Sequence, residues 1–230
     1  MRQGIIIQAR MGSSRLPGKI LMDFEGKTLL EHIIYRLKWL RSNATIVIAT
    51  SILENDDIVE TFCKEHNVGC FRGDEQNVLK RYYDCARYYQ FSDVVRMTGD
   101  NPFPDIDELD RLITFHEEGA MDFSENYSVL PIGVGMEIMS YQALKESVQN
   151  ASLPKHFEHA DEYILDNLAN YKHGTLEVPN VKNRPDVRLT VDTLQDYKKA
   201  CYILRRAQTD YVTTEQAIEL GEFYEREQMS

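Results

Sequence analysis

The stretch IIIQARMGSSRLPGK at residues 5–19 decides the fold that we expect. Its apolar start at 5–9 predicts a buried strand, and the connection that follows combines glycines and hydroxyls with the cations Arg10, Arg15 and Lys19. Such a loop can wrap phosphates, because glycines let backbone N–H groups approach oxygens while arginine and lysine supply charge. In open α/β sheets, ligands bind at the carboxyl ends of strands, where this loop must lie. A solvated surface loop is the alternative interpretation.

Outward from this stretch, further short apolar runs at 44–50 and 93–97 predict strands, each followed by a turn and a helical pattern. Apolar residues recur at helical spacing within 29–40, 58–62 and 78–86. This alternation predicts an α/β fold with a mainly parallel central sheet covered by helices.

After about residue 120 the alternation fades. Residues 133–140 are typical of a strand that ends in a helix N-cap, and helical patterns follow at 156–168 and 194–208. Residues 213–227 predict a polar, peripheral helix, whereas 150–154 and 179–185 are typical of loops. No repeat or linker interrupts the chain, so we expect a single domain over residues 1–230.

Composition narrows the functional classes. With 230 residues and 43% hydrophobic content, the chain can bury a full core without disulfides, and its four scattered cysteines indicate reduced, mostly buried thiols. A net charge of −11 disfavours nucleic acid as a partner, so an anionic ligand needs a local basic cluster. No apolar run is long enough for a signal segment or a membrane span, which predicts a cytoplasmic protein without a membrane partner.

The loop at 9–19 matches neither the glycine spacing of a dinucleotide fingerprint nor a Walker loop. It resembles the signature loop of the cytidylyltransferases that activate acidic sugars, the family of CMP-acylneuraminate and CMP-Kdo synthetases. Within that family the likeness is greatest to the spore-coat polysaccharide biosynthesis (SpsF-type) branch. The resemblance implies a three-layer αβα, Rossmann-like nucleotidyltransferase fold. It also implies nucleotide contacts from Ala9, Arg10, Met11, Gly12, Ser13, Ser14, Arg15 and Lys19.

Two short motifs supply carboxylates. Thr98-Gly99-Asp100 follows a predicted strand, and Val191-Asp192-Thr193 precedes a helical pattern. One or two carboxylates beside substrate phosphates suffice for a magnesium site, although a turn-capping role for Asp100 and an N-cap role for Asp192 are alternatives. The resemblance implies that Asp100 and Asp192 share Mg²⁺, that Thr98 and Gly99 contact the nucleotide, and that Arg15, Lys19 and Asp100 are catalytic.

The segment from 72 to 81 ends another apolar run and begins a helix, so its start should face the same crevice. In the resembling branch this region helps to close the nucleotide pocket. That likeness implies nucleotide contacts from Arg72, Gly73, Asp74, Val78 and Arg81. A solvent-facing position for Arg81 is the alternative.

Acceptor contacts are expected in the second half of the chain. Glu137 follows two glycines, Gly133 and Gly135, that could equally serve a bulge or bend. Glu158 and His159 resemble a Glu-His pair of the SpsF-type branch, which implies acceptor binding or dimer contacts; a polar helix surface is the alternative. Their spacing is wrong for a zinc protease site.

The expected reaction is transfer of CMP from CTP to an acidic sugar, a nonulosonate or Kdo-like 2-keto acid, with release of pyrophosphate, for cell-surface polysaccharide biosynthesis. Mg²⁺ is the expected cofactor, and the resemblance implies a homodimer. Residues to about 120 would bind the nucleotide, and 121–230 the acceptor and the second subunit. The acceptor carboxylate needs a cation, for which Arg96, Arg184 and Arg188 are candidates. Alternatives are another nucleoside triphosphate, a phosphorylated acceptor, or a non-catalytic binding or scaffold protein of the same fold.

Overall fold

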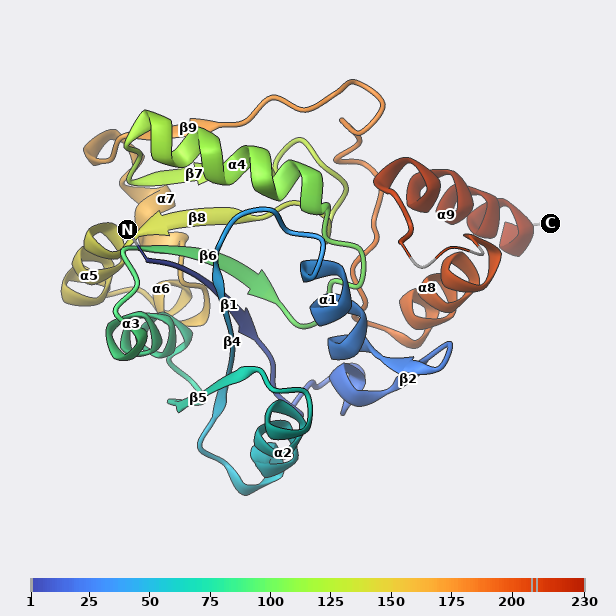
Figure 1. Ribbon diagram of the computed structural model, residues 1–230, viewed down its shortest axis with the longest axis horizontal. Coiled ribbons are helices and arrows are strands. Elements are labelled where there is room, and N and C mark those ends of the chain that lie inside the picture. Colours follow the sequence, from blue (N-terminus) through green and yellow to red (C-terminus); the bar gives the residue numbers. More distant parts are fainter. Residues whose placement is uncertain (1, 208, 210, 230) are drawn as a thin grey trace.

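The structure is a computed structural model that describes residues 2–207, 209 and 211–229. One seven-stranded sheet forms its centre, in the order β5-β4-β1-β6-β8-β7-β9 (Figure 1). Its strands are β1 (Gln3–Gln8), β4 (Thr45–Ser51), β5 (Gly69–Gly73), β6 (Asp93–Thr98), β7 (Phe123–Glu125), β8 (Glu137–Ser140) and β9 (His173–Thr175). Only β8 pairs antiparallel to its neighbours within this sheet, so the expected mainly parallel sheet is confirmed.

The first strand lies in the middle of the sheet. It pairs in parallel with β4 on one side and with β6 on the other, and Ile5, Ile6 and Ile7 are fully buried. Successive side chains of a strand point to opposite faces. Accordingly, Ile5 and Ile7 pack in one apolar cluster and Ile6 in another, which explains the continuous apolar run at the start of the chain.

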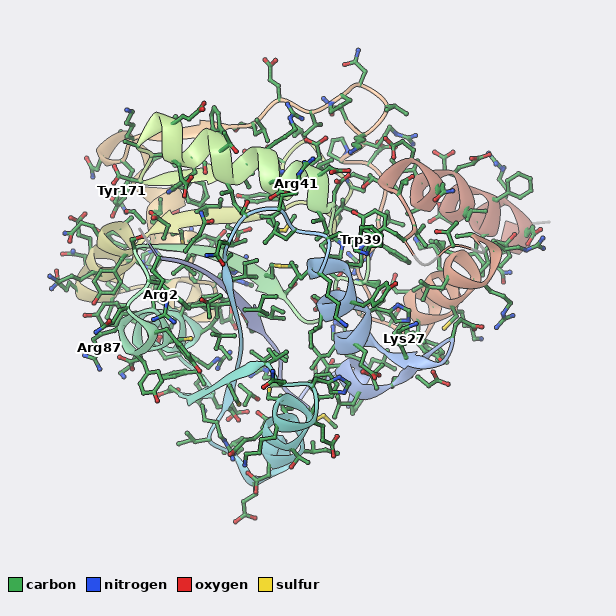
Figure 2. The ribbon with its side chains drawn as sticks, viewed as in Figure 1. Arg2, Lys27, Trp39, Arg41, Arg87 and Tyr171 are labelled. Atoms are coloured by element: carbon green, nitrogen blue, oxygen red, sulfur yellow. The ribbon has the colours of Figure 1, made fainter. Side chains whose placement is uncertain are left out.

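Helices cover both faces of the sheet. Helices α1 (Leu29–Leu37), α2 (Asp57–Glu65) and α4 (Ile106–Gly119) pack in the cluster with Ile5 and Ile7, whereas α3 (Val78–Tyr89) and α5 (Tyr141–Asn150) pack in the cluster with Ile6. Side chains fill the spaces between these layers (Figure 2). The expected three-layer αβα arrangement is therefore confirmed.

The region from 154 to 170 differs from the single helical pattern expected there. It forms two short helices, α6 (Pro154–Glu158) and α7 (Glu162–Asp166), and a 3₁₀ turn, η3 (Leu168–Asn170). The chain breaks because His159, the residue after α6, adopts an extended conformation. The expected strand at 133–140 is likewise shorter, since only Glu137–Ser140 pairs in the sheet, although Ser140 does cap α5 as expected.

The last two helices, α8 (Leu194–Ala207) and α9 (Thr214–Met229), pack beside the sheet together with the hairpin of β2 (Asp23–Phe24) and β3 (Lys27–Thr28) (Figure 1). The expected polar helix at the edge of the fold is α9, and it buries one face, since Ala217 and Ile218 lie in this third apolar cluster. The end of the predicted pattern at Gln208 lies outside the described residues. Two 3₁₀ turns, η1 (Lys19–Leu21) and η2 (Glu54–Asp56), follow β1 and β4. None of the helices described is long and apolar enough to span a bilayer.

Candidate active site

The order of the sheet reverses at β1, since β1 leads on to β4 and β5 on one side and to β6 on the other. Ligands bind outside the carboxyl ends of strands at such a point. Here the chain leaving β6 is tied to β1 by a 2.7 Å hydrogen bond from Gly99 N to Gln8 O. A Cβ at Gly99 would stand 3.0 Å from both Ala9 Cβ and Gln8 O, so glycine allows this close approach.

A cavity of about 370 Å³ opens at this point, and we call it the nucleotide pocket. Most of the first-loop residues singled out from the sequence line it, together with Thr98, Gly99 and both candidate metal aspartates. A Cβ at Gly12 would meet nothing within 4 Å, so its backbone faces open space. The lining residues are Gln8, Ala9, Arg10, Gly12, Ser13, Ser14, Arg15, Lys19, Ile20, Arg96, Thr98, Gly99, Asp100, His159 and Asp192.

Lys19 joins the two aspartates. Its Nζ donates to Asp100 Oδ2 at 2.8 Å, to Asp192 Oδ1 at 3.0 Å and to the carbonyl oxygen of Val191 at 2.7 Å. Lys19 is only 7% exposed, so a buried ammonium group is compensated by two carboxylates and a carbonyl. The structure thus brings Lys19, Asp100 and Asp192 together, as the sequence suggested.

Asp192 reaches this position because its segment packs along the loop before β8. Ile132 and Arg188 form a parallel bridge, and Val191 N donates to Asp100 O at 2.8 Å. Gly133, at φ +92°, allows the contact: a Cβ there would lie 2.7 Å from Thr190 N. A Cβ at Gly135 would likewise lie 2.4 Å from Tyr127 Cα, so both glycines before β8 serve close packing.

The N-cap interpretation of Asp192 is wrong, because Thr193 plays that part. The Thr193 hydroxyl accepts from Asp196 N at 3.2 Å, and the Asp196 carboxylate accepts from Thr193 N at 2.9 Å. The Asp192 side chain is left free of the helix start and turns to cations. The turn-capping interpretation of Asp100 likewise finds no support, since its carboxylate accepts from Lys19.

Asp192 forms ion pairs with three cations. Besides Lys19, Arg15 Nη2 lies 2.8 Å from its Oδ1 and Arg188 Nη2 lies 2.5 Å from its Oδ2. Burial alone would raise the pKa of Asp192, but the hydrogen bonds and charges of these cations hold that pKa below its ordinary value. Asp192 is therefore ionised at neutral pH and able to act as a metal ligand.

The donor set fits Mg²⁺. Two ionisable carboxylates converge on one ammonium group at the wall of the nucleotide pocket, and Mg²⁺ is usually bound by one or two carboxylates with substrate phosphates and water completing the shell. Within the described residues no group of three or more His, Cys, Asp or Glu side chains could hold a metal. A metal held by Asp100 and Asp192 would take its further ligands from phosphate oxygens and water.

Sequence reasoning missed Asp56, at the end of the turn after β4. Its carboxylate accepts from Met11 N at 2.8 Å and from Ser51 N at 3.1 Å, and it is 1% exposed. Although burial opposes ionisation, these hydrogen bonds lower the pKa of Asp56. Met11, predicted to contact the nucleotide, therefore holds the loop in place. The pairing of Asp56 with residue 11 leaves no local sequence signal.

The segment from 72 to 81 does not line the nucleotide pocket. Arg72 turns to α2, where its Nη1 lies 2.6 Å from Asp57 and 3.0 Å from Glu60. Asp74 accepts from the backbone of Gln76 and Asn77 in a local turn. Val78 is buried in the core, and Gly73 packs against the side chain of Arg81.

The alternative that Arg81 faces solvent is wrong, because its side chain is fully buried. Its Nη1 donates to the carbonyl oxygen of Asp74 at 2.5 Å, while Nε and Nη2 have no hydrogen-bond partner among the described residues. Burial lowers the pKa of Arg81.

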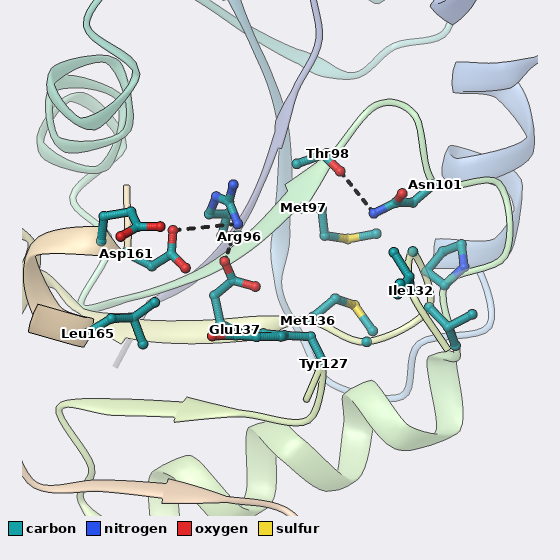
Figure 3. A pocket seen from close by; sticks show the side chains of 15 residues that line it. Arg96, Met97, Thr98, Asn101, Tyr127, Ile132, Met136, Glu137, Asp161 and Leu165 are labelled. Atoms are coloured by element: carbon teal, nitrogen blue, oxygen red, sulfur yellow. Dashed lines mark hydrogen bonds and ion pairs between the residues drawn. The ribbon is translucent and has the colours of Figure 1, made fainter. Parts of the chain in front are cut away.

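A second cavity of about 350 Å³ adjoins the nucleotide pocket and shares Arg96 and Thr98 with it. We call it the acceptor cavity. Figure 3 shows Glu137 and Asp161 approaching Arg96 from two directions. Arg96 Nη1 donates to Glu137 Oε1 and lies 3.7 Å from Asp161 Oδ1. Glu137 thus lines a cavity beside the nucleotide pocket, and its contact with an acceptor stays a prediction.

The other predicted acceptor residues, Glu158 and His159, do not line the acceptor cavity. His159 lines the nucleotide pocket instead, and Glu158 is exposed and lines neither cavity. Among the arginines, Arg96 is bound to Glu137 and Arg184 to Asp186 and Glu222, whereas Arg188 contacts Asp192 at the nucleotide pocket. None of the three arginines is free of carboxylate partners, since Arg188 also lies 3.5 Å from Asp196. Of the three, Arg96 is the one that lines the two cavities described.

With this geometry in place, comparison with known proteins assigns the class. The model of the cytidylyltransferase family matches residues 4–227. The chain is 36% identical over 204 residues to the spore coat polysaccharide biosynthesis protein SpsF of Bacillus subtilis, covering 86% of this chain and 85% of that protein. The chain belongs to the cytidylyltransferase family.

Solved structures agree with this assignment. A cytidylyltransferase from Leptospira borgpetersenii superposes with a TM-score of 0.89 at 31% identity, over 98% of this chain and 96% of that one. A CMP-2-keto-3-deoxy-manno-octonic acid synthetase complexed with CTP superposes with a TM-score of 0.69 at 19% identity, over 90% and 99% of the two chains. The latter likeness shows the shared nucleotidyltransferase fold.

Proposed function

We propose that this protein transfers CMP from CTP to an acidic sugar, a nonulosonate or Kdo-like 2-keto acid, with release of pyrophosphate. The observation that carries the proposal is the contact of Lys19 with both Asp100 and Asp192 at the carboxyl ends of the central strands. It supports a site in which a triphosphate and a metal are held side by side. The acceptor cavity opens next to it, as a two-substrate reaction requires.

In the proposed reaction an acceptor oxygen attacks the α-phosphorus of CTP. A new P–O bond forms to the sugar while the bond from the α-phosphorus to the α,β-bridging oxygen breaks, and pyrophosphate leaves with that electron pair. The proton of the acceptor hydroxyl passes to solvent. Arg10, Arg15 and Lys19 offset the growing negative charge on the phosphates. Asp100 and Asp192 would hold Mg²⁺, which supplies charge neutralisation at the phosphate oxygens.

This chemistry asks little general acid–base work of the protein, because nucleotidyl transfer depends mainly on positioning and charge stabilisation. Asp56 contributes by fixing the loop at Met11, and Gly12 leaves its backbone open to phosphate oxygens. Arg188, which contacts Asp192 beside the nucleotide pocket, is the cation that we assign to the acceptor carboxylate.

The relatives support the choice of substrates. The structural neighbour named for CMP-2-keto-3-deoxy-manno-octonic acid synthesis was solved with CTP, and the Bacillus relative is named for polysaccharide biosynthesis. A role in cell-surface polysaccharide biosynthesis, a cytoplasmic location and a homodimeric state are part of the same proposal. Light scattering of the purified protein tests the dimer.

Pyrophosphate release tests the function. The protein is incubated with Mg²⁺, one of CTP, UTP, GTP or ATP, and one acidic sugar or sugar phosphate. We expect release with CTP and a 2-keto sugar acid. Release with a different triphosphate or only with a sugar phosphate would overturn the substrate assignment, and nucleotide binding without release from any pair would favour a binding protein.

A further inference from the structure

The acceptor cavity is acidic. Among its lining residues Arg96 carries the only positive charge, against the carboxylates of Glu137, Asp161 and Glu162. Arg96 already has carboxylate partners, since its Nη1 donates a hydrogen bond to Glu137 and lies near Asp161. Glu162 Oε2 forms an ion pair, at 3.0 Å, with the Nζ of Lys155, a residue outside the cavity lining. The cavity therefore offers hydrogen-bond acceptors and negative charge, and no free cation for a second anionic group.

Asp161 supplies an independent observation that points to a ligand. It is 7% exposed, and its Oδ1 accepts no hydrogen bond from any described residue. The nearest cation, Arg96 Nη1, stands 3.7 Å from that oxygen, which is too long for a hydrogen bond. A buried carboxylate oxygen without a donor is costly, so a donor brought by the substrate would stabilise it.

The neighbouring carboxylate, Glu137, also indicates that the cavity lacks positive charge. Glu137 is 4% exposed, and burial raises its pKa to about 7, against the opposing effect of Arg96. One guanidinium nitrogen cannot compensate two buried carboxylates fully. A second cation in the cavity would complete the charge balance of the cluster.

On the basis of the proposed function, we infer that the acceptor carries an ammonium group, which the acceptor cavity binds through Asp161 and Glu137. An ammonium group supplies three donors and one positive charge, the two properties that this cluster lacks. A hydroxyl supplies a single donor and no charge, and an N-acetyl group supplies one donor, no charge and more bulk. The acceptor would then be zwitterionic, with its amine in the acceptor cavity.

The test compares two acceptors that differ in one group, 3-deoxy-manno-octulosonate and 8-amino-3,8-dideoxy-manno-octulosonate, by kcat/KM for pyrophosphate release with CTP and Mg²⁺. We expect the amino form to be favoured by about tenfold to a hundredfold, the range for a hydrogen bond between charged groups. In Asp161→Asn this preference should disappear while the affinity for CTP stays unchanged. Asp166→Asn, a charge-matched change on α7 outside the cavity lining, should keep the preference.

Equal use of the two acceptors, or a preference that survives in Asp161→Asn, would overturn the inference and leave the proposed function standing. If neither acceptor reacts, binding of each to the protein with CMP is followed by saturation-transfer NMR. Binding of the amino form that Asp161→Asn abolishes would support the inference, and absence of such binding would overturn it. Failure of the proposed function is distinguishable, because pyrophosphate would then be released from no pair of CTP and acceptor, whereas the binding comparison still reports on Asp161.

Discussion

Lys19 Nζ lies 3.0 Å from Asp192 Oδ1, a contact between residues 173 positions apart in the chain. The same ammonium group holds Asp100 at 2.8 Å, so one cation bridges the two proposed metal ligands. Arg15 also forms an ion pair with Asp192. Both cations are the ones that we assign to the triphosphate. Binding of nucleotide and binding of metal should therefore be coupled through an exchange of partners at Asp192.

This coupling predicts that the protein binds Mn²⁺, a spectroscopic substitute for Mg²⁺, weakly by itself and more tightly with CTP. The expected gain is about tenfold to a hundredfold, the usual size of coupling between two sites. Electron paramagnetic resonance of Mn²⁺ measures the free ion directly. Asp100→Asn and Asp192→Asn should lose the CTP-dependent binding, whereas Asp84→Asn, on α3, should retain it. Equal Mn²⁺ affinity with and without CTP would contradict the coupling.

Replacing Lys19 by Met should lower turnover by about a hundredfold or more, the size seen when a charge-stabilising group is lost from a site. The change leaves Asp100 and Asp192 facing each other without their shared cation. Lys27→Met is the matched control, because Lys27 is an exposed lysine in the β2–β3 hairpin. Steady-state pyrophosphate release and circular dichroism separate catalysis from folding. Turnover close to that of wild type would refute the role given to Lys19.

Asp56→Asn should raise the KM for CTP and reduce stability by about 1 to 3 kcal/mol, the cost of disturbing buried, charge-assisted hydrogen bonds. The amide keeps the shape of the side chain but can accept fewer of the bonds from Met11 and Ser51. Asp57→Asn is the control, since Asp57 is the next residue and pairs with Arg72 instead. Urea unfolding and CTP kinetics report the two effects. An unchanged KM would show that the loop holds its shape without Asp56.

The raised pKa of Glu137 predicts a pH dependence of stability. Its pKa is about 7 in the folded protein against 4.5 in the reference state, so the folded protein binds the proton more tightly. Stability from this group is thus present at low pH and is lost as pH rises from about 4.5 to about 7. Burial is the main cause of the raised pKa; among the charged neighbours, Arg96 lowers the pKa of Glu137, and Asp161 and Glu125 raise it.

Glu137→Gln removes this titration. Measured by urea unfolding, the variant should gain about 2 to 3 kcal/mol relative to wild type between pH 5 and pH 8, in proportion to the shift in pKa. Glu146→Gln, at a partly exposed position of α5, should show no such relative gain. A difference between Glu137→Gln and wild type that does not vary with pH would mean that Glu137 titrates in its ordinary range.

The sequence predicted the centre of the fold because its signals are local. An apolar run followed by a glycine-rich basic loop predicts the end of a buried strand, and the ends of parallel strands meet at one edge of the sheet. For that reason the loop at 9–19 and Asp100 could be expected together. The three-residue strands β7 and β9 carry too little periodicity to be predicted.

The parts of the site that escaped prediction depend on pairings between distant residues. Asp56 meets Met11 across 45 positions, and Arg96 meets Glu137 across 41 positions. Arg72 is the opposite case, a residue that was predicted to contact the nucleotide but does not line the pocket. Its place at the end of a strand suggested the pocket, but Asp57 and Glu60 on the neighbouring helix provide nearer partners. A charged residue near a strand end is thus a weak indicator when opposite charges lie close by.

The most direct measurement of the central claim follows the α-phosphate of CTP. CTP labelled with ³²P at the α position is incubated with the protein, Mg²⁺ and a 2-keto sugar acid, and the products are separated. We predict that the label moves to a CMP-sugar in step with pyrophosphate release, and that Asp100→Asn abolishes the transfer. Label that stays in CTP, or that appears only as free CMP, would contradict the account.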